Sequence, residues 1–342
     1  MGITKLGWYY TVFNQGGQLN SHTPPQNQRS ICPKCGYDQS GIIDTWNDQC
    51  PMTGRCSECG LSFAWRDVFD PLLNDLYWYA EHARSNRAMI RRTPGTLVRL
   101  LNPIQFWNEV DVAKPIKLRT LAVWVLLTII TTHVLVSIPL GIGLWGRSTS
   151  SWGSLTILEY IDQYSLYGIA ELTLDALFDP AMRTWISTRG GSGYSLRFQA
   201  GQRHLIYAIL IKPIVFQVGF VMLWTTVLVA IPYTRRVTKV RAKHVIRAIL
   251  LSVLMLGLSF EFTRLIYGIM MWMGFYWNGF AVARIYRIVV PVLVLWQLIY
   301  WSSVISIGWR VQPWRLLVVL GTIAALLGGF ALRVYVFLAS TL

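Results

Sequence analysis

Charge is what this sequence has least of. Only 14% of its 342 residues are Asp, Glu, Lys or Arg, where about 25% is usual for a soluble globular domain. Acidic residues are scarcest, since 31 basic residues face 16 acidic ones and leave a net charge of +15. Apolar residues reach 54%, and 16 residues are tryptophan. This composition excludes a disordered chain, which has few aromatic residues and many charges, and it indicates a membrane protein with several spans.

Recognisable catalytic motifs are also missing. The sequence contains no G-x-S-x-G, no P-loop, no H-E-x-x-H and no paired His–Asp motif. These patterns mark common hydrolases, nucleotide-binding enzymes and zinc proteases. Whether the chain is an enzyme therefore stays open, and we favour a role without catalysis.

Cysteine is absent from most of the chain. All five cysteines lie between positions 32 and 59. A secreted disulfide framework usually has an even number of cysteines spread through the fold, so this clustering favours a metal site. The first residues lack the charged start and apolar core of a cleavable signal peptide. We therefore expect the region in the reducing cytoplasm, where thiolates are free to bind zinc.

Four of the cysteines form two C-x-x-C-G knuckles with 20 residues between them. The predicted metal ligands are Cys32, Cys35, Cys56 and Cys59. In each knuckle two thiolates lie on one tight turn and can reach a single ion about 2.3 Å away. The glycine after each knuckle suits a left-handed turn. Four thiolates leave no ligand position open, so we predict one structural Zn²⁺.

The segment that carries these knuckles, about residues 30–65, resembles the zinc-ribbon family. The resemblance implies that each knuckle ends a short β-hairpin, and that Tyr37, Leu61 and Phe63 supply its apolar cover. Cys50, between the knuckles, is either an unpaired cysteine or a spare ligand. The charges of the ribbon are mixed and do not form the basic stripe of a nucleic-acid reader. We expect a cytoplasmic protein partner and no nucleic acid.

Apolar runs of about 20 residues, the length that crosses a bilayer, occur five times. They cover residues 118–145, 206–231, 245–273, 288–309 and 316–339. We therefore predict an all-α polytopic membrane protein of about five transmembrane helices, with a small β zinc-ribbon domain at its amino terminus. The acid-bearing stretch 152–187 is predicted to be an amphipathic helix at the membrane surface or on its outer side.

Basic residues predict the orientation. The regions 82–119, 232–247 and 310–315 together carry 16 Lys or Arg, whereas the two regions on the other side carry 7. Cytoplasmic loops carry the excess of basic residues, so we expect a cytoplasmic amino terminus and an outside carboxyl terminus, in a bacterial inner membrane. The stretch 82–119 is also predicted to attract anionic lipid of the bilayer.

The chain divides into four predicted regions. These are a flexible polar tail (1–29), the zinc ribbon (30–66), a cytoplasmic basic juxtamembrane helical linker (67–117) with a helix over 67–92, and a five-span domain (118–339) with an outer loop at 146–204.

Two ionisable residues lie within the third predicted span. Glu261 and Arg264 are three positions apart, so they share one helix face. Charges inside a membrane are functional candidates, since burying one costs at least about 2.5 kcal/mol. We favour an internal ion pair that fixes helix packing and is joined by His133 or Arg333. The alternative is a proton or ion relay.

The layout of residues 97–339 carries a second resemblance. A proline-aromatic entry at 100–107, the pattern of 295–300 followed by 313–315, and Gly-Tyr-Ser-Leu at 193–196 resemble the Yip (Ypt-interacting protein) family. Its Asp-Leu-Tyr-Gly-Pro run is absent. The resemblance implies a non-enzymatic membrane adaptor or scaffold, here with a cytoplasmic zinc ribbon for protein contacts. The alternatives are a transporter or channel component and a subunit of a membrane enzyme complex. The oligomeric state stays open.

Overall fold

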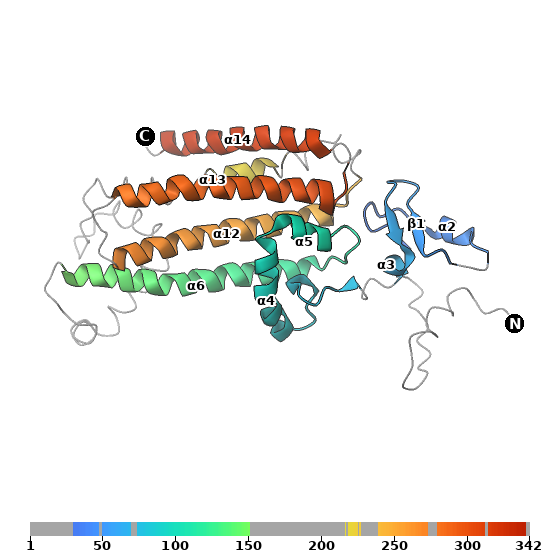
Figure 1. The fold of residues 1–342 in the computed structure, drawn as a ribbon, viewed down its shortest axis with the longest axis horizontal. Helices are drawn as coiled ribbons and strands as arrows, with labels where there is room; N and C mark the ends of the chain where they lie inside the picture. The colour runs from blue at the N-terminus through green and yellow to red at the C-terminus, as the bar shows by residue number, and fades with distance from the viewer. Residues whose placement is uncertain are drawn as a thin grey trace.

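Long helices lie side by side in this protein, and a small domain with a β-hairpin lies at one end of them (Figure 1). We call that end of the long helices the ribbon end. The computed structural model describes residues 30–47, 50–69, 74–150, 239–272, 279–311 and 314–339, together with 216, 218–224 and 226. The predicted tail, the stretch 152–187 and the outer loop beyond residue 150 lie outside the described residues.

Within the described residues, four helices are long and apolar enough to cross a membrane. They are α6 (Leu118–Ser150), α12 (Ala242–Trp272), α13 (Gly279–Ser303) and α14 (Trp314–Ala339). A π-helical turn, η4 (Val304–Gly308), continues α13 at the ribbon end. Four such helices fit an integral membrane protein, and they correspond to the first, third, fourth and fifth predicted spans.

The second predicted span, 206–231, falls largely outside the described residues, so the count of five stays a prediction. Its described residues are helical, and they pack against the bundle. Trp224 stacks on Trp301 of α13 with ring centroids 5.8 Å apart. The most extensive helix packing joins α6 and α12, which run in the same direction (Figure 1).

The linker contains several short helices. They are α3 (Trp65–Phe69), the 3₁₀ turn η2 (Ala80–His82), α4 (Asn86–Leu100) and α5 (Pro103–Glu109). The predicted continuous helix over 67–92 is therefore wrong. A proline at position 71 disfavours helix in the residue before it. The Ser85 hydroxyl accepts a hydrogen bond from the Ala88 N–H at 3.2 Å, and this cap begins a new helix.

The ribbon is built on one hairpin. Strands β1 (Thr53–Arg55) and β2 (Ser62–Ala64) pair antiparallel, and the second knuckle forms the turn between them. The first knuckle lacks a matching hairpin in the described residues, since only the isolated bridge Ile31↔Asp38 forms there. The short helix α2 (Ser40–Asp44) follows it.

Several aromatic rings pack against one another in the ribbon's core. The Trp65 ring lies 4.6 Å from Trp46 and 5.0 Å from Phe63, edge to face in both cases, a favourable geometry for aromatic pairs. Leu61 and Phe63 are buried as expected, but Tyr37 is 47% exposed and does not cover the site. Trp46 and Trp65 take the covering role that the resemblance assigned to the tyrosine.

Candidate metal centre

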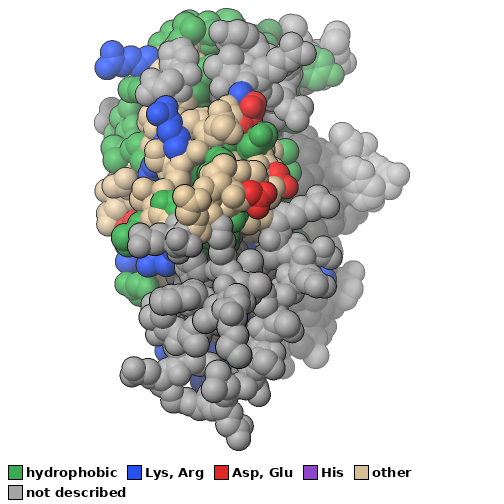
Figure 2. Space-filling view, turned by 90° about the vertical axis from the view of Figure 1, so that its right-hand side faces the viewer, with side chains coloured by type: hydrophobic (Ala, Val, Ile, Leu, Met, Phe, Trp, Pro, Cys, Tyr) green, Lys and Arg blue, Asp and Glu red, His purple; other side chains and the backbone are tan. Residues whose placement is uncertain are grey.

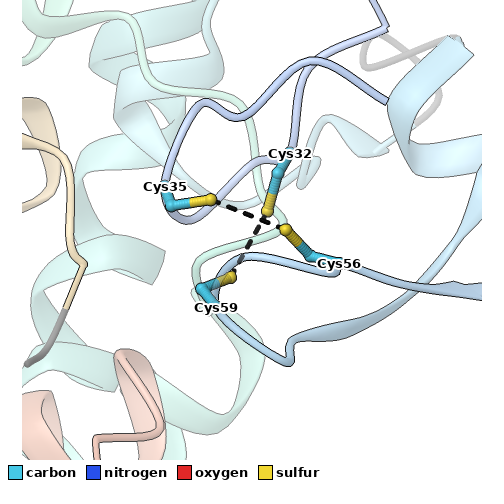
Figure 3. Close-up of side chains that lie close together, drawn as sticks. All are labelled: Cys32, Cys35, Cys56 and Cys59. Carbon is cyan, nitrogen blue, oxygen red and sulfur yellow. Dashed lines mark hydrogen bonds between the residues drawn. The ribbon is translucent and has the colours of Figure 1, made fainter. Parts of the chain in front are cut away.

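The four predicted ligands point toward one common centre (Figure 3). Their Sγ atoms all lie within 4.8 Å of one another, and the Sγ atoms of Cys32 and Cys59 and of Cys35 and Cys56 are 3.7 Å apart. A tetrahedral ion with sulfur ligands at 2.3 Å requires a sulfur–sulfur distance of about 3.8 Å. The cluster therefore has the dimensions of a single four-coordinate metal site.

Both knuckles reach this geometry through the same backbone turn. Gly36 and Gly60 adopt φ values of +80° and +68°, a left-handed conformation that glycine adopts at little cost. Each of these glycines donates its N–H to the carbonyl of the first cysteine in its knuckle at 2.9 Å. Two equivalent turns from different parts of the chain thus present four thiols to one point.

The surroundings of the thiols are unequal. Burial raises the pKa of Cys32 to about 11 and raises the pKa of Cys35 even further. Burial acts in the same direction on Cys56, but N–H groups of its own knuckle outweigh it and lower the pKa of that thiol to about 7. The Gln39 side chain also donates to the Cys56 sulfur at 3.3 Å. Donors of this kind stabilise the thiolate, the form that binds metal.

Cys50 lies outside the cluster. Its thiol donates to the Pro51 carbonyl at 3.4 Å, and the four-sulfur group of the described residues does not include it. The interpretation as a spare ligand gains no support from this position.

The metal-binding end of the ribbon faces the rest of the protein. His244 of α12 donates to the Pro33 carbonyl at 2.9 Å, and the Arg241 N–H donates to the Lys34 carbonyl at 3.1 Å. The second knuckle is held as well, because the Lys239 ammonium lies 2.5 Å from the Glu58 carboxylate. We call residues 239–244, which contact both knuckles, the docking segment.

A further contact reaches the ribbon end of α13. The Lys34 ammonium donates to the Arg310 carbonyl at 3.2 Å. Burial lowers the pKa of Lys34, although the nearby sulfurs favour its charged form. The sequence does not predict this docking, since residues 34 and 310 are 276 positions apart.

A buried ion pair ties the linker to α12, and the sequence did not single it out. The Arg247 Nε atom lies 3.1 Å from Glu81 Oε2, and both side chains are almost completely buried. The Lys117 N–H donates to the same carboxylate at 2.8 Å, and Arg247 donates to the Pro115 carbonyl at 2.5 Å. The sequence signal for this ion pair is a single acid, Glu81, within the aromatic stretch 77–82.

The predicted intramembrane pair forms a larger cluster between α6 and α12. Arg264 lies 2.7 Å from the Glu261 carboxylate, as their spacing predicts. The His133 imidazole is 2.8 Å from Glu261 and 2.6 Å from Arg264, and Arg264 also donates to the Ser137 hydroxyl at 3.2 Å. The side chain of Arg333 lies outside the described residues.

Comparisons with protein-family models, with curated proteins and with solved structures found no match to this chain. The resemblance to the Yip family gains no support from them and stays a prediction. The apolar helices and the four-cysteine cluster rest on the geometry given above.

Proposed function

We propose that this chain is a non-enzymatic adaptor of the membrane, in which a zinc ribbon docked on the helix bundle binds a cytoplasmic protein. The closed set of four cysteines carries this proposal. All four positions of a tetrahedral ion are filled by protein ligands, which leaves none for water or substrate, the arrangement of a structural site. Four soft sulfur ligands at this spacing favour Zn²⁺, with iron as the chemical competitor.

The excess of basic residues at 82–119 and 232–247 supports a cytoplasmic ribbon. Reporter fusions after Gly60, within 148–203, at Lys239 and after Leu342 should report inside, outside, inside and outside. A first and last fusion on the same side would contradict the orientation, because the number of spans would then be even. The same fusions, expressed in a bacterium, test the assignment to the inner membrane.

Docking of the knuckles leaves the opposite end of the ribbon as the surface for a partner. Met52, at the open end of the hairpin, is 89% exposed. Figure 2 looks at this side of the molecule, and apolar, acidic and basic side chains are mixed on its described part. A mixed face of this kind fits a protein segment better than a nucleic acid, which requires clustered basic residues.

Site-specific photocrosslinking in living cells tests the adaptor function. A photoreactive amino acid at position 52 of the full-length protein should yield a protein adduct of one defined mass. The matched control places the same group at Leu320 of α14, a half-exposed apolar position in a predicted span, where no protein adduct of that mass should form. Absence of a defined adduct at position 52 would contradict the proposed function.

The intramembrane cluster is the observation that favours the alternative function. His133 is about one-third exposed while the acid and base it contacts are buried, an arrangement that could pass a proton to Glu261. Histidine and carboxylate chains of this kind serve as proton relays in transporters. Paired substitutions of Glu261 and Arg264, described in the Discussion, separate a relay from a packing role.

A further inference from the structure

Helix α4 lies across the long helices near their ribbon end (Figure 1). Hydrogen bonds from two tryptophans show where α4 lies along the long helices. The Trp124 indole donates to the Thr93 hydroxyl at 2.9 Å, and the Trp296 indole donates to the Leu101 carbonyl at 3.2 Å. Both tryptophans belong to stretches apolar enough to cross a membrane, Leu118–Ile138 and Pro291–Gly308. The helix therefore lies beside the spans and not beyond their ends.

The two faces of α4 differ in what they contact. Met89, Thr96 and Leu100 are buried against the protein. The outer face carries large apolar side chains that remain exposed: Ile90 at 70%, Val98 at 67%, Leu101 at 63% and, at the start of α5, Ile104 at 55%. Soluble proteins rarely leave such a contiguous apolar row uncovered. The row lies beside stretches apolar enough to cross a membrane, which makes a bilayer the medium expected to cover it.

The arginines of α4 divide between the same two faces. Arg92 donates to the carbonyls of Leu76 and Tyr79, and Arg99 lies 3.7 Å from the Glu109 carboxylate. Arg87 and Arg91 are exposed on the outer side. Neither forms an ion pair within the part of the chain that the structure describes. The inner arginines thus hold the protein together, and the outer ones are available to an external anion.

We propose that the outer face of α4 and the start of α5 is a docking surface for anionic lipid. The apolar row from Ile90 to Ile104 lies among acyl chains, and the guanidinium groups of Arg87 and Arg91 bind headgroup phosphates. Arg87 and Arg91 are one helical turn apart, next to Ile90. Helices that lie in the interface plane combine such apolar and basic residues. This surface is independent of the partner proposed for the ribbon.

Selectivity for spin-labelled lipid tests the proposal on the full-length protein. The protein is reconstituted in phosphatidylcholine bilayers that contain trace spin-labelled phosphatidylglycerol or phosphatidylcholine, and the motionally restricted fraction is measured. Preference for phosphatidylglycerol should fall about fivefold for each arginine removed in Arg87→Gln and Arg91→Gln. The Arg87→Lys, Arg91→Lys double variant keeps the charge and should keep most of the preference.

The matched control is Arg55→Gln with Arg66→Gln, which removes the same charge from exposed positions of the ribbon. Its lipid preference should equal that of the wild type. An equal loss in both double variants, or a loss in neither, would overturn the proposal. Melting temperatures of all variants establish that they are folded, which is expected because the substituted side chains are exposed.

Photocrosslinking identifies what covers the apolar row. A photoreactive amino acid at Ile90 or Val98 should yield lipid adducts in native membranes, and the same group at Met52 should not. A protein adduct at Ile90 in place of lipid would show that a protein covers this face and would overturn the proposal. Failure here leaves the ribbon adduct at position 52 unaffected, so the two proposals fail separately.

Discussion

Helix α12 contacts the rest of the protein through two ionic clusters that are built differently. Near the ribbon end, Arg247 pairs with Glu81, 166 positions away in the sequence. Farther along the helix, Arg264 pairs with Glu261 on the next turn of the same helix. The first pair joins two separate segments of the fold. The second is neutral within one helix before it contacts α6 through His133.

This difference determines what each cluster contributes. Removal of one partner from a buried ion pair leaves an uncompensated charge, which is strongly destabilising. At the ribbon end, loss of Glu81 would leave Arg247 with backbone carbonyls alone. In the span cluster, loss of Arg264 would leave Glu261 with the His133 imidazole, 2.8 Å away. We therefore expect the stability of α12 at its ribbon end to depend on segments more distant in the sequence than does the stability of its other half.

Metal removal should have the largest effect, and it should act on one half of α12 only. Structural zinc in small domains supplies about 10–16 kcal/mol of apparent binding free energy, so the ribbon should unfold without its ion. Wild-type protein should contain one zinc per chain. Chelation or Cys59→Ser should increase hydrogen exchange in residues 30–66 and in the docking segment, while residues 255–266 remain protected.

Cys50→Ser is the control for this experiment, because Cys50 lies outside the cluster. It should bind zinc as the wild type does. Full zinc content in Cys59→Ser would refute the four-cysteine site. Unchanged exchange in residues 239–244 after chelation would show that these residues fold independently of the ribbon.

Breaking the Glu81–Arg247 pair should have the next largest effect. Glu81→Leu or Arg247→Leu alone should lower the unfolding free energy by about 3–5 kcal/mol, because the remaining charge is buried. The double apolar variant should recover a substantial part of the loss. Thermal unfolding in detergent measures this. Additive losses in the double variant would contradict an interaction between the two side chains.

The intramembrane pair should respond in the same way but less strongly. We expect Glu261→Leu or Arg264→Leu to cost about 3 kcal/mol, the lower end of the range for broken buried pairs, since each residue also contacts His133. Glu261→Gln should be the mildest single change. The double apolar variant should be more stable and more abundant in the membrane than either leucine single variant.

The same set of variants separates packing from transport. If the pair fixes helix packing, the double variant recovers both its abundance and the phenotype lost in a gene deletion. If the pair is a proton or ion relay, the double variant is folded and abundant yet inactive, because no titratable carboxylate remains. The second result would favour the transporter alternative over the adaptor.

The parts of this structure that could be predicted from the sequence depend on local spacing. Cys32 and Cys35 lie on one turn, so their spacing alone predicts that both thiols can bind the same ion. The second knuckle repeats this spacing and completes the site. Glu261 and Arg264 follow helical periodicity. The apolar runs predict four of the helices for the same reason, since length and composition alone define a span.

The parts that could not be predicted depend on contacts between distant segments. Nothing near Pro33 indicates that its carbonyl accepts a hydrogen bond from His244, and nothing near Glu81 indicates Arg247. The rule that cytoplasmic loops are rich in basic residues counts Arg247 in the same way whatever the residue packs against. That rule therefore cannot identify its partner. The helix expected over 67–92 does not form as one piece, because the proline at 71 disfavours helix before it and Ser85 caps the start of a new helix.

The smallest expected effect comes from pH and again concerns only the ribbon end. His82 accepts a hydrogen bond from the Leu76 N–H at its Nδ1 atom, 2.8 Å away. Its proton therefore lies on Nε2, which donates to the Pro115 carbonyl at 3.0 Å. Burial lowers the pKa of His82 below its ordinary value of 6.5, although the Pro115 carbonyl and the charges of Glu81 and Asp75 oppose this. Because Nδ1 accepts a hydrogen bond, the folded protein favours the neutral imidazole.

The direction of the pH dependence follows from proton binding. Between the lowered pKa of His82 in the folded protein and 6.5, the unfolded chain binds more protons than the folded one, so the free energy of unfolding falls as the pH falls. Above about pH 7.5 His82 is neutral in both states and contributes no slope.

His82→Gln should therefore lower the melting temperature at pH 8 but flatten its decline between pH 7 and pH 5. Parallel melting curves for wild type and variant across that range would show that His82 does not titrate on unfolding. Acid-induced hydrogen exchange in residues 76–83 should be smaller in His82→Gln than in the wild type, because His82 lies within this segment.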